Sequence, residues 1–138
     1  MIAFGPLPQV AADELLARFV AVEKWIRADN TIRQDAFIPP RDLNLSVTRH
    51  RLLSEEQLWE IGQTVANAVS QKQPARLFGR ADVSVAAVAK TALRAEAVPV
   101  AANPNHAHII GWPQDKPKQK FIAQQLAAAA TFVAKKPL

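Results

Sequence analysis

The apolar residues of this chain repeat with two different periods, which predict helices in some segments and strands in others. Leu15, Phe19, Val22 and Ile26 recur at spacings of three and four residues, as on one face of a helix. This pattern predicts a first helix over residues 10–28.

A strict alternation of apolar and polar residues appears next, where Leu43, Leu45 and Val47 are separated by polar side chains. Such a period of two is typical of a strand with one buried face, so we expect a strand near residues 43–49. The clearest cationic cluster of the chain, Arg49-His50-Arg51, stands at its end.

A second helix is expected over residues 54–72, because Ser54 and Gln57 have the spacing of a capping box. In this helix Gly62 follows Trp59 by about one turn, so a large residue stands beside a small one. This arrangement predicts that another element approaches the helix closely at Gly62.

The last helix is expected over residues 117–134, with Asp115 as its cap and Pro117 in its first turn. Apolar residues such as Ile122 and Leu126 cover a wide face of this helix. A face of this width packs against the rest of the chain or against a second copy in a homodimer.

The segment between these helices fits two interpretations. Residues 76–102 contain short apolar runs that suit a helix or a strand, and we predict a short helix over residues 82–93 with Asp82 as its cap. An edge strand is expected near residues 98–101, because Pro99 has no N–H to donate, and another near residues 106–111. The predicted fold is α+β, with a small mixed or antiparallel sheet packed against three main helices.

Length and composition favour one compact domain over residues 1–138. The chain has no cysteine, which excludes disulfides and thiolate chemistry and fits a reducing compartment. No signal-like or membrane-spanning run is recognised, so a cytoplasmic protein without a membrane association is expected. No cofactor is expected either, because the chain lacks a Walker loop and a dinucleotide glycine motif.

The chain concentrates unusual chemistry between Asn103 and Pro113. If this segment is a strand, the side chains of His106 and His108 leave the same face, about 7 Å apart. Two imidazoles at this spacing can chelate a metal, bind an anion or share acid–base chemistry, or they can simply be polar residues on a solvated face. A metal site needs another ligand, which His50, Asp35, Asp42 or Asp115 would have to supply.

Positive charge gathers toward the C-terminus of a chain whose net charge is +5. Residues 111–138 carry five lysines and one aspartate, a net charge of +4, and Lys116, Lys118 and Lys120 surround the start of the last helix. This cluster fits an anionic protein or a nucleic acid as partner, or a solvated lysine face. The triplet at residues 49–51 similarly fits an anion contact, or pairing with Asp35, Asp42 or a main-chain carbonyl.

Leu45-Ser46-Val47 followed by Arg49, and Asn103-Pro104 followed by His106-Ala107-His108, form a pattern. It resembles that of small uncharacterised bacterial proteins in which an LSV strand precedes an NPxHAxIxGWP segment. The resemblance carries no catalytic role, but it implies that Arg49 and His106 are neighbours in the fold.

Two functional hypotheses follow from these residues. The first is a non-enzymatic binding or adaptor module for a protein or an anionic partner. The second is a small enzyme acting on a phosphoester or another anion, in which His106 and His108 act as an acid–base pair or metal ligands and Arg49 stabilises negative charge. The candidate binding residues are Arg49, His50, Arg51, Asn103, His106, His108, Trp112, Lys116, Lys118 and Lys120.

Overall fold

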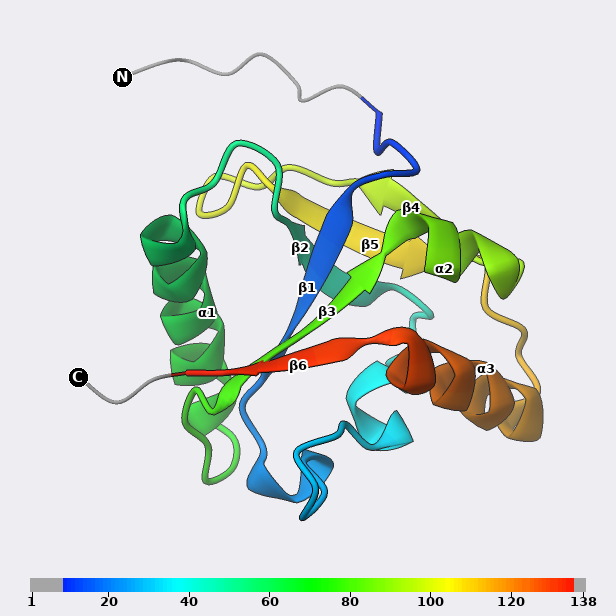
Figure 1. Ribbon diagram of the computed structural model, residues 1–138, viewed down its shortest axis with the longest axis horizontal. Coiled ribbons are helices and arrows are strands. Elements are labelled where there is room, and N and C mark those ends of the chain that lie inside the picture. Colours follow the sequence, from blue (N-terminus) through cyan, green and yellow to red (C-terminus); the bar gives the residue numbers. More distant parts are fainter. Residues whose placement is uncertain (1–8, 136–138) are drawn as a thin grey trace.

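Among residues 9–135, which the computed structural model describes, six strands form one antiparallel sheet (Figure 1). In sheet order they are β4 (Arg94–Ala97), β5 (His106–Ile110), β2 (Leu45–Arg49), β1 (Leu15–Val20), β3 (Gly79–Ser84) and β6 (Thr131–Ala134). Strands β4 and β6 are therefore the two edges of the sheet.

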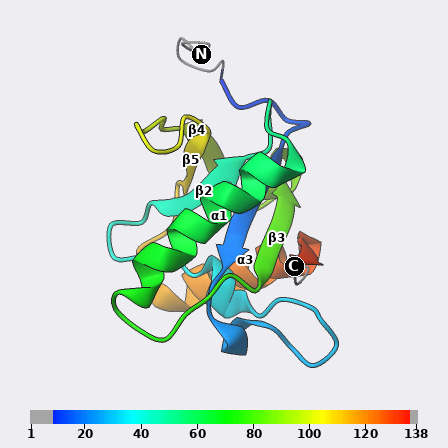
Figure 2. The same cartoon turned by 90° about the vertical axis from the view of Figure 1, so that its left-hand side faces the viewer.

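Helices cover both faces of this sheet (Figure 2). On one face lies α1 (Glu55–Ser70), whose Leu58 and Ala66 pack with Phe19 of β1. The opposite face is covered by η2 (Gln34–Phe37), α2 (Val85–Lys90) and α3 (Lys116–Ala129), while η1 (Glu23–Trp25) follows β1 in the chain. The α+β class predicted from the sequence is confirmed. None of the helices within residues 9–135 has the length and apolar character needed to cross a membrane.

Three predicted elements are confirmed by the structure. Strand β2 lies within residues 43–49, β5 lies within residues 106–111, and α1 lies within residues 54–72. The capping box at the start of α1 is also formed, since Ser54 and Gln57 each accept a hydrogen bond from the main chain of the other.

The helix predicted over residues 10–28 is wrong, because this segment contains β1 and the single turn η1. Leu16 and Ala17 are both 0% exposed, although neighbouring residues of a strand point to opposite faces. A strand that is covered on both faces has an almost continuous apolar run, and such a run also fits the spacing of a helix.

The short helix predicted over residues 82–93 is half correct. Residues 85–90 are helical, but Asp82 belongs to β3 and does not cap α2. The cap is Ser84, whose hydroxyl oxygen accepts the N–H of Ala87 at 3.0 Å. An N-cap side chain therefore does stand before this helix, two residues later than predicted.

The strand predicted near residues 98–101 is also misplaced, because β4 ends at Ala97. Pro99 instead precedes a tight turn in which Val100 and Asn103 exchange two main-chain hydrogen bonds of 3.1 and 3.0 Å. The residues of β4 have little intrinsic strand preference, and pairing with β5 holds them in this conformation.

The helix predicted over residues 117–134 ends early, at Ala129. Ala130 is extended, with ψ of 151°, and the chain continues as β6 along β3. The β-branched Thr131 and Val133 favour this strand, whereas the alanine run before them contains no helix-stop signal. The two strands lie close together, since a Cβ added to Gly79 would stand 2.5 Å from the Val133 carbonyl oxygen.

Candidate functional site

Arg49 faces the side of the sheet opposite α1 and is 0% exposed. Its Nε and Nη2 donate to Glu14 Oε1 and Oε2 at 2.8 and 2.7 Å, and its Nη1 is buried without a hydrogen-bond partner among the described residues. Burial raises the pKa of Glu14, but hydrogen bonds from Arg49 and the Ala11 N–H, together with the Arg49 charge, hold the pKa below its ordinary value of 4.5. Arg49 is therefore part of a buried ion pair.

The resemblance implied that Arg49 and His106 are neighbours in the fold. Their main chains lie on paired strands, but their side chains do not meet. Strands β2 and β5 pair, and His106 stands opposite Thr48 on the face that carries α1. Because successive side chains of a strand alternate, Arg49 points away from His106 and His108. The acid–base arrangement that combined these three side chains is thus not formed.

The carboxylate partners predicted for the cationic triplet, Asp35 and Asp42, were wrong. Arg49 pairs with Glu14, and His50 Nε2 lies 2.8 Å from Asp82 Oδ1, while Arg51 is exposed. Both carboxylates lie in segments for which helices were predicted, so their positions beside β2 were not recognised. Neither Asp35 nor Asp42 forms an ion pair among the described residues.

The Asn-Pro-Asn segment before β5 holds main chain together. Asn105 Nδ2 donates to the carbonyl oxygens of Arg49 and Arg51, and Asn103 Nδ2 donates to Thr48 Oγ1 at 3.0 Å. Both asparagines are buried. Their side chains thus fix the end of β2 against the start of β5.

The remaining predicted site residues are dispersed. Trp112 is buried in the core, where its Nε1 donates to the Ile109 carbonyl oxygen at 3.0 Å. Lys116, Lys118 and Lys120 are exposed around the first turns of α3. Asp115 occupies the N-cap of this helix, although its side chain makes no capping hydrogen bond.

His106 and His108 do lie together on one face of β5, with ring centroids 4.8 Å apart and ring planes at 84°. Both side chains are partly exposed. Within residues 9–135 no group of three or more histidine, aspartate or glutamate side chains is placed to hold a metal ion. The third ligands considered from the sequence, His50, Asp35, Asp42 and Asp115, therefore do not complete a metal site with this pair.

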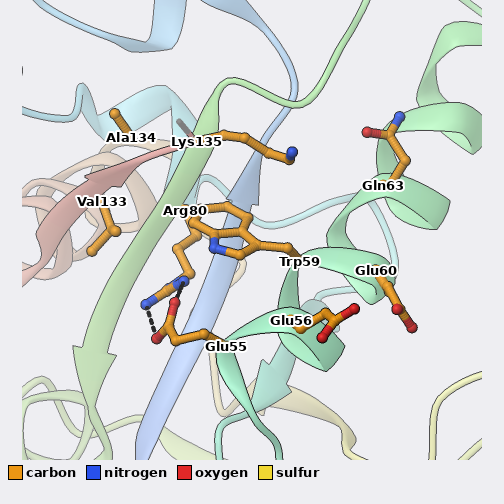
Figure 3. A pocket seen from close by; sticks show the side chains of 9 residues that line it. All are labelled: Glu55, Glu56, Trp59, Glu60, Gln63, Arg80, Val133, Ala134 and Lys135. Atoms are coloured by element: carbon orange, nitrogen blue, oxygen red, sulfur yellow. Dashed lines mark hydrogen bonds and ion pairs between the residues drawn. The ribbon is translucent and has the colours of Figure 1, made fainter. Parts of the chain in front are cut away.

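A different feature, a groove of about 680 Å³, lies between α1 and the sheet edge formed by β6 (Figure 3). Its helix wall carries acidic and polar residues, and its sheet wall carries Arg80 and the end of β6. The lining residues are Glu55, Glu56, Trp59, Glu60, Gln63, Arg80, Val133, Ala134 and Lys135.

Arg80 organises the base of this groove. Its Nη1 and Nη2 donate to the Glu55 carboxylate at 3.0 and 2.9 Å, and its Nε donates to Asp82 at 3.0 Å. The guanidinium carbon also lies 4.7 Å from the centroid of the Trp59 ring, within the range of a cation–π contact. These contacts hold the Trp59 ring in place.

The charge of Arg80 is already balanced by its neighbours. Its hydrogen bonds to Glu55 hold the pKa of that carboxyl below its ordinary value of 4.5. Glu56 and Glu60 are exposed and have no ion-pair partner among the described residues. The helix wall therefore offers two uncompensated carboxylates to the groove.

No protein family, curated protein or solved structure matches this chain.

The sequence predicted a close approach at the helix that forms one wall of the groove, but it did not predict the groove itself. Trp59 and Gly62 were expected to meet another element, and a Cβ added to Gly62 would indeed lie 2.6 Å from the Phe19 ring. Arg80 and Val133 were missed, because no strand was predicted over residues 79–84 and the last predicted helix included residues 131–134. The alternation of Thr131 and Val133 after the alanine run was the available signal.

Proposed function

We propose that this protein is a binding module that takes up an extended, basic peptide segment in the groove between α1 and β6. The observation that supports it is the combination of an open strand edge with a helix wall that carries two uncompensated carboxylates. The binding is expected to be non-enzymatic, as in an adaptor.

The open edge supplies main-chain hydrogen bonds. Lys135 donates its main-chain N–H to the Phe78 carbonyl oxygen at 2.9 Å, so every second residue of β6 faces β3. The main-chain groups of Phe132 and Ala134 then point away from β3, and within residues 9–135 no strand pairs with this side of β6. An extended peptide can add itself here as a further strand.

The charged residues that line the groove favour a basic partner. Glu55, Glu56 and Glu60 contribute three negative charges to the lining, and Arg80 and Lys135 contribute two positive ones, which leaves a net charge of −1. Arg80 is turned toward Glu55 and Asp82, so the accessible charge of the helix wall is that of Glu56 and Glu60. Arginine or lysine of a bound strand would reach these carboxylates.

The Trp59 ring adds an apolar surface between the two walls (Figure 3). It is half-buried and is held in place by Arg80. Aromatic side chains at the centre of an interface contribute much of its binding energy, because they bury a large area at a small cost in conformational entropy. Trp59 is therefore expected to contact the alkyl stem of a basic side chain.

The charge preference is tested with two fluorescent peptides of about eight residues, one alternating valine with arginine and the other alternating valine with glutamate. We expect the protein to bind the arginine peptide at least about tenfold more tightly, as measured by fluorescence anisotropy. The double variant Glu56→Lys/Glu60→Lys should lose this preference. The matched control Asp13→Lys/Glu23→Lys changes the net charge equally at exposed positions outside the groove and should keep it. Equal affinity for both peptides, or no binding up to about 1 mM, would overturn the proposal.

The strand edge is tested with proline at Ala134. Proline removes a main-chain N–H that points away from β3, so the β3–β6 pairing should remain while the edge is blocked. We expect affinity for the arginine peptide to fall at least about tenfold, because a hydrogen bond is lost and the ring obstructs the edge. The matched control is Ala97→Pro, which removes an outward N–H from the other edge of the sheet and should leave peptide binding unchanged. Unaltered binding by Ala134→Pro would place the peptide elsewhere.

A further inference from the structure

His106 and His108 stand at the other end of the sheet from the peptide groove, on the same face as α1. His108 lies directly opposite Glu96 of β4 and Ser46 of β2, both of which are exposed. This places two imidazoles, a carboxylate and a hydroxyl in one cross-strand group that the peptide groove does not use.

The orientation of His106 is set by a main-chain carbonyl. Its Nδ1 lies 3.0 Å from the Val98 carbonyl oxygen, and since a carbonyl only accepts hydrogen bonds, Nδ1 carries the proton. The lone pair is then on Nε2. Histidines that ligate a metal are commonly held in this way, with one nitrogen donating to a carbonyl and the other facing the ion.

The His108 side chain has no hydrogen-bond partner among the described residues. Both nitrogens of its ring are therefore free to reach an ion.

The spacing of the two rings suits a shared ion. An imidazole nitrogen lies about 2.0–2.1 Å from Zn²⁺, so two rings on a tetrahedral ion have centres roughly 5 Å apart. The observed centroid distance is 4.8 Å. Little movement of the main chain is needed to bring both rings to one metal.

We propose that His106 and His108 form a two-imidazole chelate site for a divalent transition metal ion such as Zn²⁺ or Ni²⁺. Among residues 9–135 no third side chain already completes the group. By strand register, Glu96 is the carboxylate directly opposite His108, and directly opposed residues have Cβ atoms about 5 Å apart. Rotation of its exposed side chain would supply an oxygen to the ion. Water fills the remaining positions.

The test is isothermal titration of the purified protein with Zn²⁺ and, separately, Ni²⁺ at pH 7.5. We expect one ion per chain, and His106→Asn or His108→Asn should weaken binding at least about tenfold, since even the loss of a group behind a ligand costs about 10–100-fold. His50→Asn is the matched control, because it removes the third imidazole, which pairs with Asp82, and should leave the affinity within about twofold. Glu96→Gln should weaken binding less than either ligand variant does.

Folding of each variant is checked by its circular dichroism spectrum, and the wild-type site is checked by the ¹⁵N shift of His106 Nε2 on metal addition. Protons compete for the same nitrogens, so affinity should fall as the pH is lowered. The proposal is overturned if the double variant His106→Asn/His108→Asn binds as tightly as the wild type, which would mean adventitious binding only. It is also overturned if the wild type gives no binding heat and no Nε2 shift at about 1 mM metal.

Discussion

Replacement of Glu14 by alanine is expected to lower the free energy of unfolding by about 3–5 kcal/mol, which is a large part of the stability of a small domain. Arg49 is 0% exposed, and Glu14 is its ion-pair partner among the described residues. Without the carboxylate a buried cation remains uncompensated, and its Nη1 already lacks a hydrogen-bond partner. Urea unfolding at pH 7 measures the change.

The double variant Glu14→Leu/Arg49→Met separates this explanation from a simple loss of packing. It removes both charges and keeps apolar volume, so it should recover most of the stability that Glu14→Ala loses. If the double variant is as unstable as Glu14→Ala, the ion pair is not the cause and the explanation fails.

The ion pair between Glu14 and Arg49 also makes the stability of the protein depend on pH. The pKa of Glu14 is lowered in the folded protein, so its contribution is fully present above its unfolded pKa of about 4.5 and is lost as the pH falls through the folded value. Urea midpoints measured from pH 7 down to pH 3 should fall more steeply below about pH 4.5 for the wild type than for the double variant. Parallel curves would contradict the assignment.

Replacement of Asn105 by alanine is the second large effect that we expect, with a loss of at least about 2 kcal/mol. The Asn105 side chain donates to the Arg49 carbonyl oxygen in a buried hydrogen bond and to the Arg51 carbonyl oxygen in a partly buried one. A buried carbonyl left unpaired costs about 1–3 kcal/mol. Asn105→Asp provides the sharper comparison, because it keeps the size but replaces the donor with an acceptor. In urea unfolding, both variants should have a clearly lower free energy of unfolding than the wild type. If either variant is as stable as the wild type, Asn105 does not fix the end of β2.

Local signals predicted much of the fold. The alternation in β2 and the capping box of α1 are encoded within a few residues, so the sequence alone identifies them. The β1 strand was mistaken for a helix, because its burial on both faces depends on neighbours far away in the chain. Strand β6 was missed for a similar reason, since its conformation depends on pairing with β3.

The candidate site was harder to predict than the fold. The spacing of His106 and His108 correctly placed them on one face, whereas the side chain of Arg49 was expected near His106 and lies on the opposite face. The groove lies between α1 and β6, which are more than sixty residues apart in the chain. No short sequence motif predicts that two such distant segments lie side by side. Its acidic wall was not predicted from the sequence.

The most direct measurement is amide hydrogen exchange of the ¹⁵N-labelled protein with and without the arginine peptide. If the peptide adds to β6, exchange at Phe132 and Ala134 should slow, while Val133, whose main chain faces β3, should change little. The opposite edge at Arg94–Ala97 should be unaffected. Unchanged exchange at Phe132 and Ala134 in the presence of bound peptide would contradict the account.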